Sequence, residues 1–210
     1  MSGDDGFPGK PQDWLGIGPK REPDETGMAE GIEQFLRSAG YDAADEDHLR
    51  DTARRVAETW HHDLLEGHRK DPRDALGAPF HDHSKELVLV KGLEFYSSCP
   101  HHLMPYRGTA YVAYVPAGKA VGFSGIVRLL DCLAHRLTLQ EWLARGVTAV
   151  LDEVLDPQGS ACVLDAAPMC VIARGVRRPC DIVATSFSGV FRTDPALRHA
   201  VFDAAGLSRA

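Results

Sequence analysis

The spacing of hydrophobic residues changes along the chain, and each change predicts a different kind of element. Apolar residues recur at helical spacing over Met28–Ala39 and over Asp45–Glu66, where Gly67 ends the pattern. In Glu86–Ser98 this period gives way to dense β-branched and aromatic residues, which are typical of a strand. Residues 1 to about 26 are rich in Gly, Pro, Asp and Lys without an apolar period, so we expect a disordered tail there.

The second half of the chain alternates between strand-like and helix-like spacing. Ser124–Leu155 has the helical period, with Ser124 as the expected N-cap and a break between two helices at 137–139. Asp194 and Pro195 open a last helix that extends to about Ala205. Three further segments are rich in β-branched residues and predict strands: Thr109–Val115, Ala161–Ala173 and Asp181–Phe191.

The order of these elements predicts an α+β domain, in which a four-stranded, mostly antiparallel sheet carries two long helices on one face. We expect a tail at 1–26, an N-terminal helical segment at 27–80, and a domain at 81–210 that holds the chemistry. The chain has 210 residues, of which 44% are hydrophobic, so it can bury one substantial core.

Composition narrows the class of protein. The formal net charge of −7 argues against a nucleic-acid or membrane surface as the partner. No apolar run approaches the roughly 18–20 residues that a membrane span needs, and the opening Met-Ser-Gly-Asp-Asp lacks the pattern of a signal peptide. Five cysteines at irregular spacing do not form a disulfide pattern, so we expect a reduced, cytoplasmic protein.

Two short segments carry the candidate chemistry, Cys99-Pro100-His101-His102 and Pro168-Met169-Cys170. Together they offer two thiolates and one or two imidazoles, the ligand set that zinc prefers, and three such ligands leave a fourth position for water. The alternative is structural, because free cysteines often pack as small hydrophobes and paired histidines often lie on surface loops. We expect packing roles for Cys132 and Cys162, and Cys180 has no evident partner.

From about Asp51 to the C-terminus, the chain resembles the GTP cyclohydrolase I family, a group of zinc enzymes with the tunnelling fold (T-fold). Several separate motifs occur in the family's order, which makes a chance match improbable. They are Asp51-Thr52-Ala53-Arg54-Arg55-Val56-Ala57, Ser98-Cys99-Pro100-His101-His102, Val121-Gly122-Phe123-Ser124, Arg128, Arg136-Leu137, Leu139-Gln140-Glu141, Met169-Cys170-Val171, Ala173-Arg174-Gly175-Val176 and Thr185-Ser186.

The resemblance implies a role for each of these residues. Zn²⁺ would be held by Cys99, His102 and Cys170, and His101 would be the adjacent acid/base histidine. The substrate-binding residues fall into two groups, a guanine-facing pair and a set that meets the triphosphate: Gln140 and Glu141, and then Arg55, Ser124, Arg128 and Arg174. Without the resemblance, a solvated helix face and ordinary surface salt bridges would be the better interpretations of these polar residues.

Three positions depart from the family's pattern, all of them close to the implied chemistry. Pro168 stands where the family has its second catalytic histidine, and proline has neither an ionisable group nor a backbone N–H. Gly125 stands where a phosphate-binding lysine is usual, and Pro100 where glutamate is usual.

The resemblance therefore implies that water activated on zinc opens the guanine imidazole ring at C8 of GTP or a related guanine nucleotide, with or without release of formate. Because of Pro168, we expect the reaction to stop before the pterin ring closes. Two alternatives stay open, an ordinary GTP cyclohydrolase I that makes 7,8-dihydroneopterin triphosphate and a non-catalytic zinc-containing protein that binds a nucleotide or pterin. The nitrile reductase branch of the same fold finds little support in these motifs. We expect a homo-oligomer, by resemblance a decamer, with active sites at subunit interfaces.

Overall fold

The computed structural model describes residue 19, residues 21–42 and residues 47–207. Its main sheet consists of β2 (Val88–Ser98), β3 (Pro105–Val115), β5 (Gly159–Pro168) and β6 (Ile182–Phe187). The strands lie in the order β2-β3-β5-β6, and every neighbouring pair is antiparallel. The α+β class expected from the sequence is therefore confirmed.

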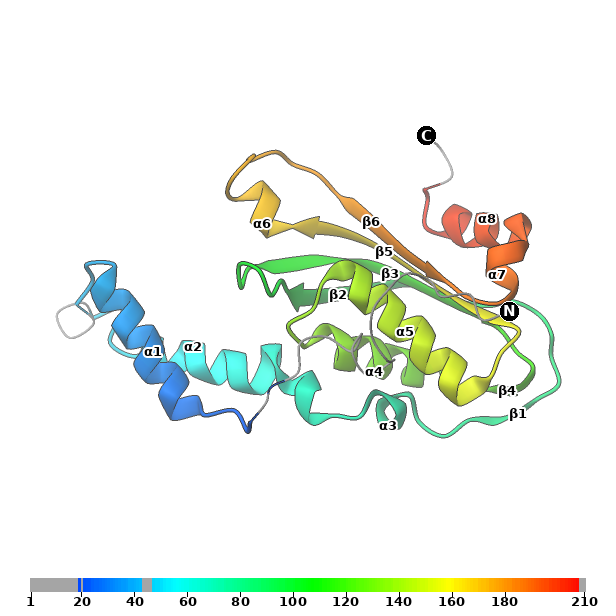
Figure 1. Cartoon of the computed structure of the whole chain (residues 1–210), viewed down its shortest axis with the longest axis horizontal. Helices are drawn as coiled ribbons and strands as arrows, with labels where there is room; N and C mark the ends of the chain where they lie inside the picture. Colours follow the sequence, from blue (N-terminus) through cyan, green and yellow to red (C-terminus); the bar gives the residue numbers. More distant parts are fainter. Residues whose placement is uncertain (1–18, 20, 43–46, 208–210) are drawn as a thin grey trace.

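Two long helices cover one face of this sheet, as Figure 1 shows. They are α4 (Phe123–Ala134) and α5 (Gln140–Leu155), separated by the short connection predicted at 137–139. The helices and the sheet share one core, because each presents a stripe of buried aliphatic residues to the other. On the helices this stripe consists of Ile126, Leu129, Leu130, Leu133, Leu143, Val147, Val150 and Leu151.

The start of α4 differs from the sequence prediction. The N-cap is Gly122, and Ser124 lies inside the first turn with its side chain exposed. No side-chain hydrogen bond caps this helix. The family motif drew attention to the serine, whereas the extended backbone at Gly122 decides where the helix begins.

Two short helices, α7 (Val190–Thr193) and α8 (Pro195–Ala204), pack on the opposite face of the sheet. The predicted strand over Asp181–Phe191 is too long, because β6 ends at Phe187 and the chain turns at Gly189. Gly189 has a φ of 48°, and a Cβ there would overlap the carbonyl oxygen of Gln158. Only glycine fits that turn.

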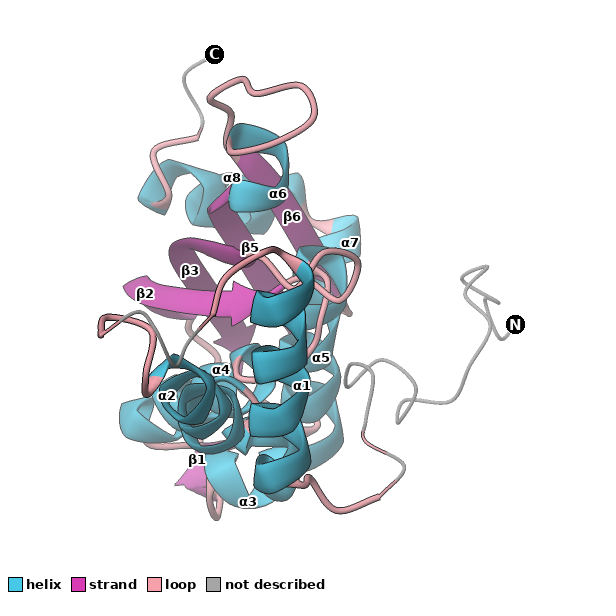
Figure 2. Cartoon of the chain, turned by 90° about the vertical axis from the view of Figure 1, so that its left-hand side faces the viewer, coloured by secondary structure: helices cyan, strands magenta, loops and turns pink. Residues whose placement is uncertain are grey.

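The N-terminal half is mainly helical. It contains α1 (Glu25–Ser38), α2 (Thr52–Glu58), a π-helical turn η2 (Thr59–Leu64) and a 3₁₀ turn η3 (Glu66–Arg69). A short helix α3 (Pro72–Leu76) and the strand β1 (Phe80–Asp82) follow, and β1 pairs with β4 (Gly118–Ala120) in a small antiparallel sheet. Figure 2 shows α1 and α2 together beside the sheet domain.

Both predicted helix boundaries in this half were inaccurate. The first helix begins at Glu25, before the predicted Met28, because the Asp24 side chain accepts a hydrogen bond from the Gly27 N–H and caps it. The second begins at Thr52, seven residues after the predicted start at Asp45. Asp45 itself and most of the predicted tail at 1–26 lie outside the described residues.

Across residues 21–42 and 47–207, no helix is both long and apolar enough to cross a membrane.

The contact between α3 and α4 depends on Gly125. This glycine is buried, and a Cβ on it would overlap the backbone carbonyl oxygen of Leu76, which is itself fully buried. Arg128, one turn later on α4, donates its Nε–H to the Ala75 carbonyl at 3.0 Å. The Arg128 hydrogen bond thus joins the end of α3 to α4, next to a close backbone contact at Gly125 that only glycine permits.

We predict that Gly125→Ala lowers the free energy of unfolding by about 1–3 kcal/mol, because α3 must move away to relieve the overlap. Gly31→Ala is the matched control, since Gly31 lies inside α1 and a Cβ there would meet no atom within 4 Å. That variant should gain about 0.5–1 kcal/mol from the higher helix propensity of alanine. Urea denaturation measures both, and equal stability of the two variants would contradict the packing argument.

A half-buried histidine makes the fold sensitive to acid. His68 Nε2 accepts a hydrogen bond from the Leu137 N–H, and burial, with further contributions from Arg136 and Arg69, lowers the pKa of His68 from 6.5 to about 4. The unfolded chain therefore binds a proton below pH 6.5 that the folded chain does not bind until about pH 4. The stabilisation is present above pH 6.5 and is lost as the pH falls towards 4.

We predict that His68→Gln reduces this loss of stability, because the glutamine oxygen can still accept from Leu137 but does not titrate. Chemical denaturation of both proteins at several pH values between 4 and 7 measures the effect. Parallel curves for the wild type and the variant would show that His68 does not contribute.

Candidate metal centre

The loop between β2 and β3 holds Cys99 and His102 in one tight turn. The Cys99 N–H donates to the Met104 carbonyl and the Leu103 N–H donates to the Cys99 carbonyl, both at 2.9 Å. Leu103 adopts a left-handed backbone conformation with a φ of 52°, which is costly for a leucine and is held by these two bonds. The loop therefore fixes two candidate ligands three residues apart on a rigid hairpin.

The third candidate ligand reaches the same end of the sheet through β5. The sequence predicts Cys170 within a strand over Ala161–Ala173, but β5 ends at Pro168 and Cys170 lies on the short helix α6 (Met169–Ile172). Proline cannot donate to the strand ladder, so it suits the end of a strand. Tyr106 on β3 pairs with Ser97 on one side and with Pro168 on the other, so both neighbouring strands end beside it.

This arrangement brings Cys99, His102 and Cys170 together, with one ligand atom of each within 4.8 Å of the others. Ligand atoms around a tetrahedral zinc ion lie about 3.3–3.8 Å apart, so small side-chain rotations are enough to close the site. Cys99 is buried, Cys170 is half-buried and His102 is exposed. The donor set and its one open side fit a zinc ion with three protein ligands.

The electrostatics of the two thiols also suit a cation. Burial raises the pKa of the Cys170 thiol, and the neighbouring Cys99 sulfur raises it further, whereas Arg174 lowers it. Two thiolates this close repel each other in the absence of a positive charge. A divalent cation would remove that repulsion.

His101 lies next to this cluster and is exposed. Its ring centroid is 6.3 Å from that of His102, with the rings nearly perpendicular at 87°. The three ligand atoms that cluster together do not include one from His101. Its ring is therefore left available for another contact at the open side of the site.

Tyr106 connects the metal cluster to the start of α5, a link that sequence reasoning missed. The Tyr106 hydroxyl donates to the Thr138 carbonyl at 3.2 Å, and the Thr138 N–H donates to the Ser98 carbonyl at 3.2 Å. Burial raises the pKa of Tyr106, and Cys99 and Glu141 both add to this effect. Glu141 and Cys99 therefore both act electrostatically on one tyrosine of the same chain.

Gln140 and Glu141 have different surroundings although they are neighbours. Gln140 is buried, and its side-chain nitrogen donates to the carbonyls of Leu164 at 2.9 Å and Ile182 at 2.6 Å. Its amide nitrogen therefore ties the start of α5 to β5 and β6. Glu141, in the first turn of α5, is exposed.

The predicted phosphate-binding residues are dispersed in this chain. Arg174 is close enough to Cys170 to influence its pKa, so it lies near the metal cluster. Arg128 is bonded to Ala75, and Arg55, on α2, donates to the His48 carbonyl and the Thr52 hydroxyl. Ser124 is exposed near the start of α4. The structure therefore brings Arg174 to the cluster, whereas Ser124 and Arg128 lie on α4 and Arg55 lies on α2.

Two histidines could have replaced the acid/base group missing at Pro168. His135 Nδ1 lies 3.1 Å from Glu66 Oε1, and His199 Nε2 lies 3.4 Å from Asp203 Oδ2. Each thus has a carboxylate partner, and neither belongs to the metal cluster.

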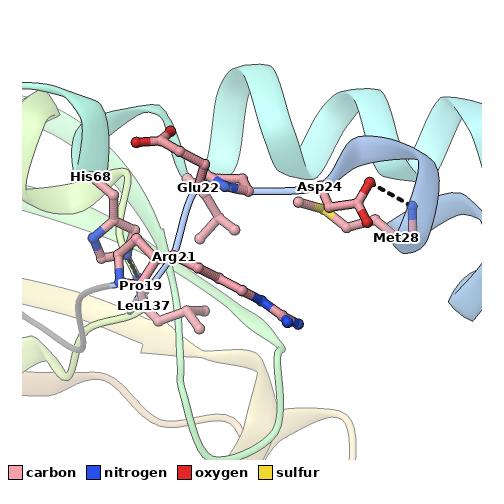
Figure 3. A pocket seen from close by; sticks show the side chains of 10 residues that line it. Pro19, Arg21, Glu22, Asp24, Met28, His68 and Leu137 are labelled. Carbon is pink, nitrogen blue, oxygen red and sulfur yellow. Dashed lines mark hydrogen bonds between the residues drawn. The ribbon is translucent and has the colours of Figure 1, made fainter.

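A separate groove of about 740 Å³ lies between the N-terminal segment and the sheet domain (Figure 3). Arg21, Asp24 and Met28 line it on one side, and His68 and Leu137 line it on the other. None of the three clustered ligands lines this groove. It is therefore distinct from the metal centre, although Leu137 forms a backbone bridge with Ser98, the residue before Cys99.

Comparison with known proteins identifies a family. A family model described as GTP cyclohydrolase I matches residues 28–206. The GTP cyclohydrolase 1 of Chromobacterium violaceum is 36% identical over 177 residues, which cover 84% of this chain and 85% of that protein. The GTP cyclohydrolase 1 of Bacillus subtilis is 36% identical over 185 residues, which cover 87% and 96% respectively.

A solved structure titled as the archaeosine synthase QueF-Like in the apo form aligns with a TM-score of 0.38 at 20% identity, over 48% of this chain and 92% of that one. A likeness this weak carries no argument. The family match and the relatives instead extend over most of the chain, and they confirm the resemblance seen in the motifs. The chain belongs to the GTP cyclohydrolase I family.

Proposed function

We propose that this protein is a zinc-dependent, GTP cyclohydrolase I-like enzyme that hydrolytically opens the imidazole ring at C8 of GTP or a related guanine nucleotide. The observation that carries the proposal is the convergence of Cys99, His102 and Cys170 at one end of the sheet. The family and the names of the relatives supply the reaction class.

In this proposal, zinc is held by Cys99, His102 and Cys170. A zinc ion with three such ligands supplies Lewis-acid activation of a water molecule at neutral pH. The exposed His102 side leaves the site open to substrate, while the buried Cys99 side fixes it to the sheet. The donor set supports this assignment, because two thiols and an imidazole are typical zinc ligands.

Glu141 is proposed to recognise guanine. Its exposed carboxylate can accept hydrogen bonds from N1–H and from the exocyclic amino group together, a pair of donors that adenine does not present. Its charge contributes to the raised pKa of Tyr106, as does that of Cys99, which supports a guanine subsite near the metal cluster. Gln140 would serve the same subsite by positioning the start of α5, since its amide nitrogen is bonded to the sheet.

His101 is proposed to transfer the proton to the imidazole-ring nitrogen that is released when the ring opens. A histidine titrates close to neutral pH, which suits a group that must both donate and accept. Its exposed ring beside His102 supports the role.

Pro168 is proposed to change where the reaction ends. It offers no proton, and no other histidine joins the cluster in the described part of the chain. The later steps would then lack their proton relay, so the product would be a formamidopyrimidine or a diaminopyrimidine, with or without release of formate. An ordinary cyclohydrolase that reaches 7,8-dihydroneopterin triphosphate is the alternative if another group supplies that proton.

Phosphate binding is proposed to rely on Arg174, with Arg55, Arg128 and Ser124 as further contacts. Arginine offers a planar, permanently charged fork for phosphate oxygens. The cation usual after Ser124 is absent, and the packing of Leu76 against Gly125 leaves no space for it. The protein would therefore bind the triphosphate more weakly, for example with a preference for a guanine nucleotide that has fewer phosphates.

We propose further that the protein is a homo-oligomer, a decamer by analogy with its family, with the catalytic domain at 81–210 following an N-terminal helical segment. The two outer strands, β2 and β6, are open to edge-to-edge pairing, which oligomerisation would satisfy. All five cysteines are free thiols, which supports a reducing, cytoplasmic setting.

Pro168 and Gly125 also favour one second candidate. A protein that keeps the metal and the guanine subsite but has lost proton transfer and a phosphate contact would bind its nucleotide or pterin without turnover. The two functions differ in one observable, the consumption of GTP.

We predict that the purified protein holds one zinc ion at Cys99, His102 and Cys170, and that Cys170→Ser loses this equivalent. Even the loss of a group that supports a ligand costs about 10–100-fold in metal affinity or activity, so removing a ligand should cost more than about 100-fold. Elemental analysis and a formate assay measure the two quantities. Cys180→Ser, at a half-buried cysteine outside the cluster, is the control and should keep both. Full activity of Cys170→Ser would contradict the proposed metal centre.

We predict that incubation with GTP, GDP and GMP yields a product in which the imidazole ring is open and the pterin ring has not closed. Pro168→His should shift the product mixture towards the pterin. Mass spectrometry resolves the stages, since loss of formate and ring closure each change the mass. His101→Ala should lower the rate about 10²–10⁴-fold. Complete conversion by the wild type to dihydroneopterin triphosphate would overturn the early stop, and unchanged nucleotide with measurable binding would favour the non-catalytic candidate.

A further inference from the structure

A second group of metal-binding side chains lies in the N-terminal helices, apart from the cluster around Cys99. Glu25 is in the first turn of α1, and His61 and His62 are consecutive residues of the π-helical turn η2. One carboxylate oxygen and one nitrogen of each imidazole all lie within 4.8 Å of one another.

The π-helical turn makes this grouping possible. Consecutive residues of an α-helix point about 100° apart, so two neighbours rarely address one ligand. In η2 the Leu65 N–H bonds to the Trp60 carbonyl five residues back, and the wider turn places the two imidazole rings edge to face, with centroids 4.6 Å apart. Such π turns occur frequently at functional sites.

The hydrogen bonding of the two rings is unequal. His62 Nε2 lies 3.0 Å from Glu25 Oε2. His61 Nδ1 is buried, and it has no hydrogen-bond partner among the described residues. A buried polar atom without a partner costs free energy, and in a native protein it calls for an explanation such as an ion.

We propose that Glu25, His61 and His62 form a second divalent-metal site, of the two-histidine, one-carboxylate type that suits zinc, cobalt or nickel, and that the metal fastens α1 to η2. Imidazole nitrogen and carboxylate oxygen are ordinary ligands for these ions. The site has no cysteine, so the metal ions that it prefers differ from those preferred by the cluster of Cys99, His102 and Cys170.

The reason for such a fastening lies in how α1 is attached. None of the residues of α1 is buried, so its apolar contacts with the rest of the protein are weak. Glu25 is also next to Asp24, which caps α1 and lines the N-terminal groove. A metal at Glu25 would hold both the first turn of α1 and one wall of that groove in place.

The test compares metal content across matched variants of the full-length protein. After equilibration with excess Zn²⁺ and removal of free ion, we expect two equivalents per chain in the wild type and one in His62→Asn. Glu25→Gln, which keeps the shape of the side chain, should also bind one. His199→Asn is the control, because His199 has a carboxylate partner in Asp203 but no third ligand, and it should keep two.

Cobalt identifies which site is lost. In the Co²⁺-loaded protein, His62→Asn should retain the sulfur-to-cobalt charge-transfer band, and Cys170→Ser should lose it while it keeps one equivalent of metal. Amides of 25–38 should exchange more slowly with solvent when the wild type binds zinc, and this protection should be absent in His62→Asn.

Three outcomes would overturn the proposal: a single equivalent in the wild type that disappears in Cys170→Ser, two equivalents in both His62→Asn and Glu25→Gln, or an equal loss in His199→Asn. This inference and the proposed enzymatic function are tested separately, because the cobalt band and Cys170→Ser report on the thiolate site alone. Either proposal can therefore fail while the other is supported.

Discussion

The pairing of Tyr106 with Ser97 on one side and with Pro168 on the other aligns the ends of three strands at one end of the sheet. The Cys99 loop leaves β2 at this point, and α6 with Cys170 leaves β5 there. The Tyr106 hydroxyl then bonds to Thr138, in the connection before α5. One buried residue thus sets the relative positions of the loop, α6 and the start of α5. Most of the catalytic geometry proposed for this protein depends on that register.

The start of α4, which follows β4 and lies away from this end of the sheet, shows how a change in chemistry and a change in packing can occur together. Gly125 removes a cation from the implied phosphate site, and it also allows the Leu76 carbonyl to approach α4. Arg128 bonds to the neighbouring carbonyl of Ala75 and strengthens the contact. A lysine could not be restored here by substitution alone, because backbone atoms fill the space. The departure from the family's pattern is therefore built into the fold.

Different interactions hold the N-terminal helices in place. The sheet domain is held by a continuous hydrophobic core, whereas α1 buries none of its residues. The Glu25–His62 pair is the ion pair that joins it to η2 among the described residues. Polar contacts on a surface are individually weak, so this region is where a bound ion can change the structure most.

The sequence by itself determined the family, the α+β class and the approximate place of the main helices and strands, because hydrophobic period and motif order are local properties of the chain. It also singled out Cys99, His102 and Cys170 as a set. It could not determine that Cys170 lies on a helical turn or that Tyr106 bonds to Thr138 before α5, because both follow from strand register between distant segments. The π-helical turn and the overlap at Gly125 were likewise hidden, since the first is a matter of backbone hydrogen bonding and the second of a contact with Leu76, 49 residues earlier in the chain. Local pattern selects the elements, and only their packing in three dimensions decides which side chains meet.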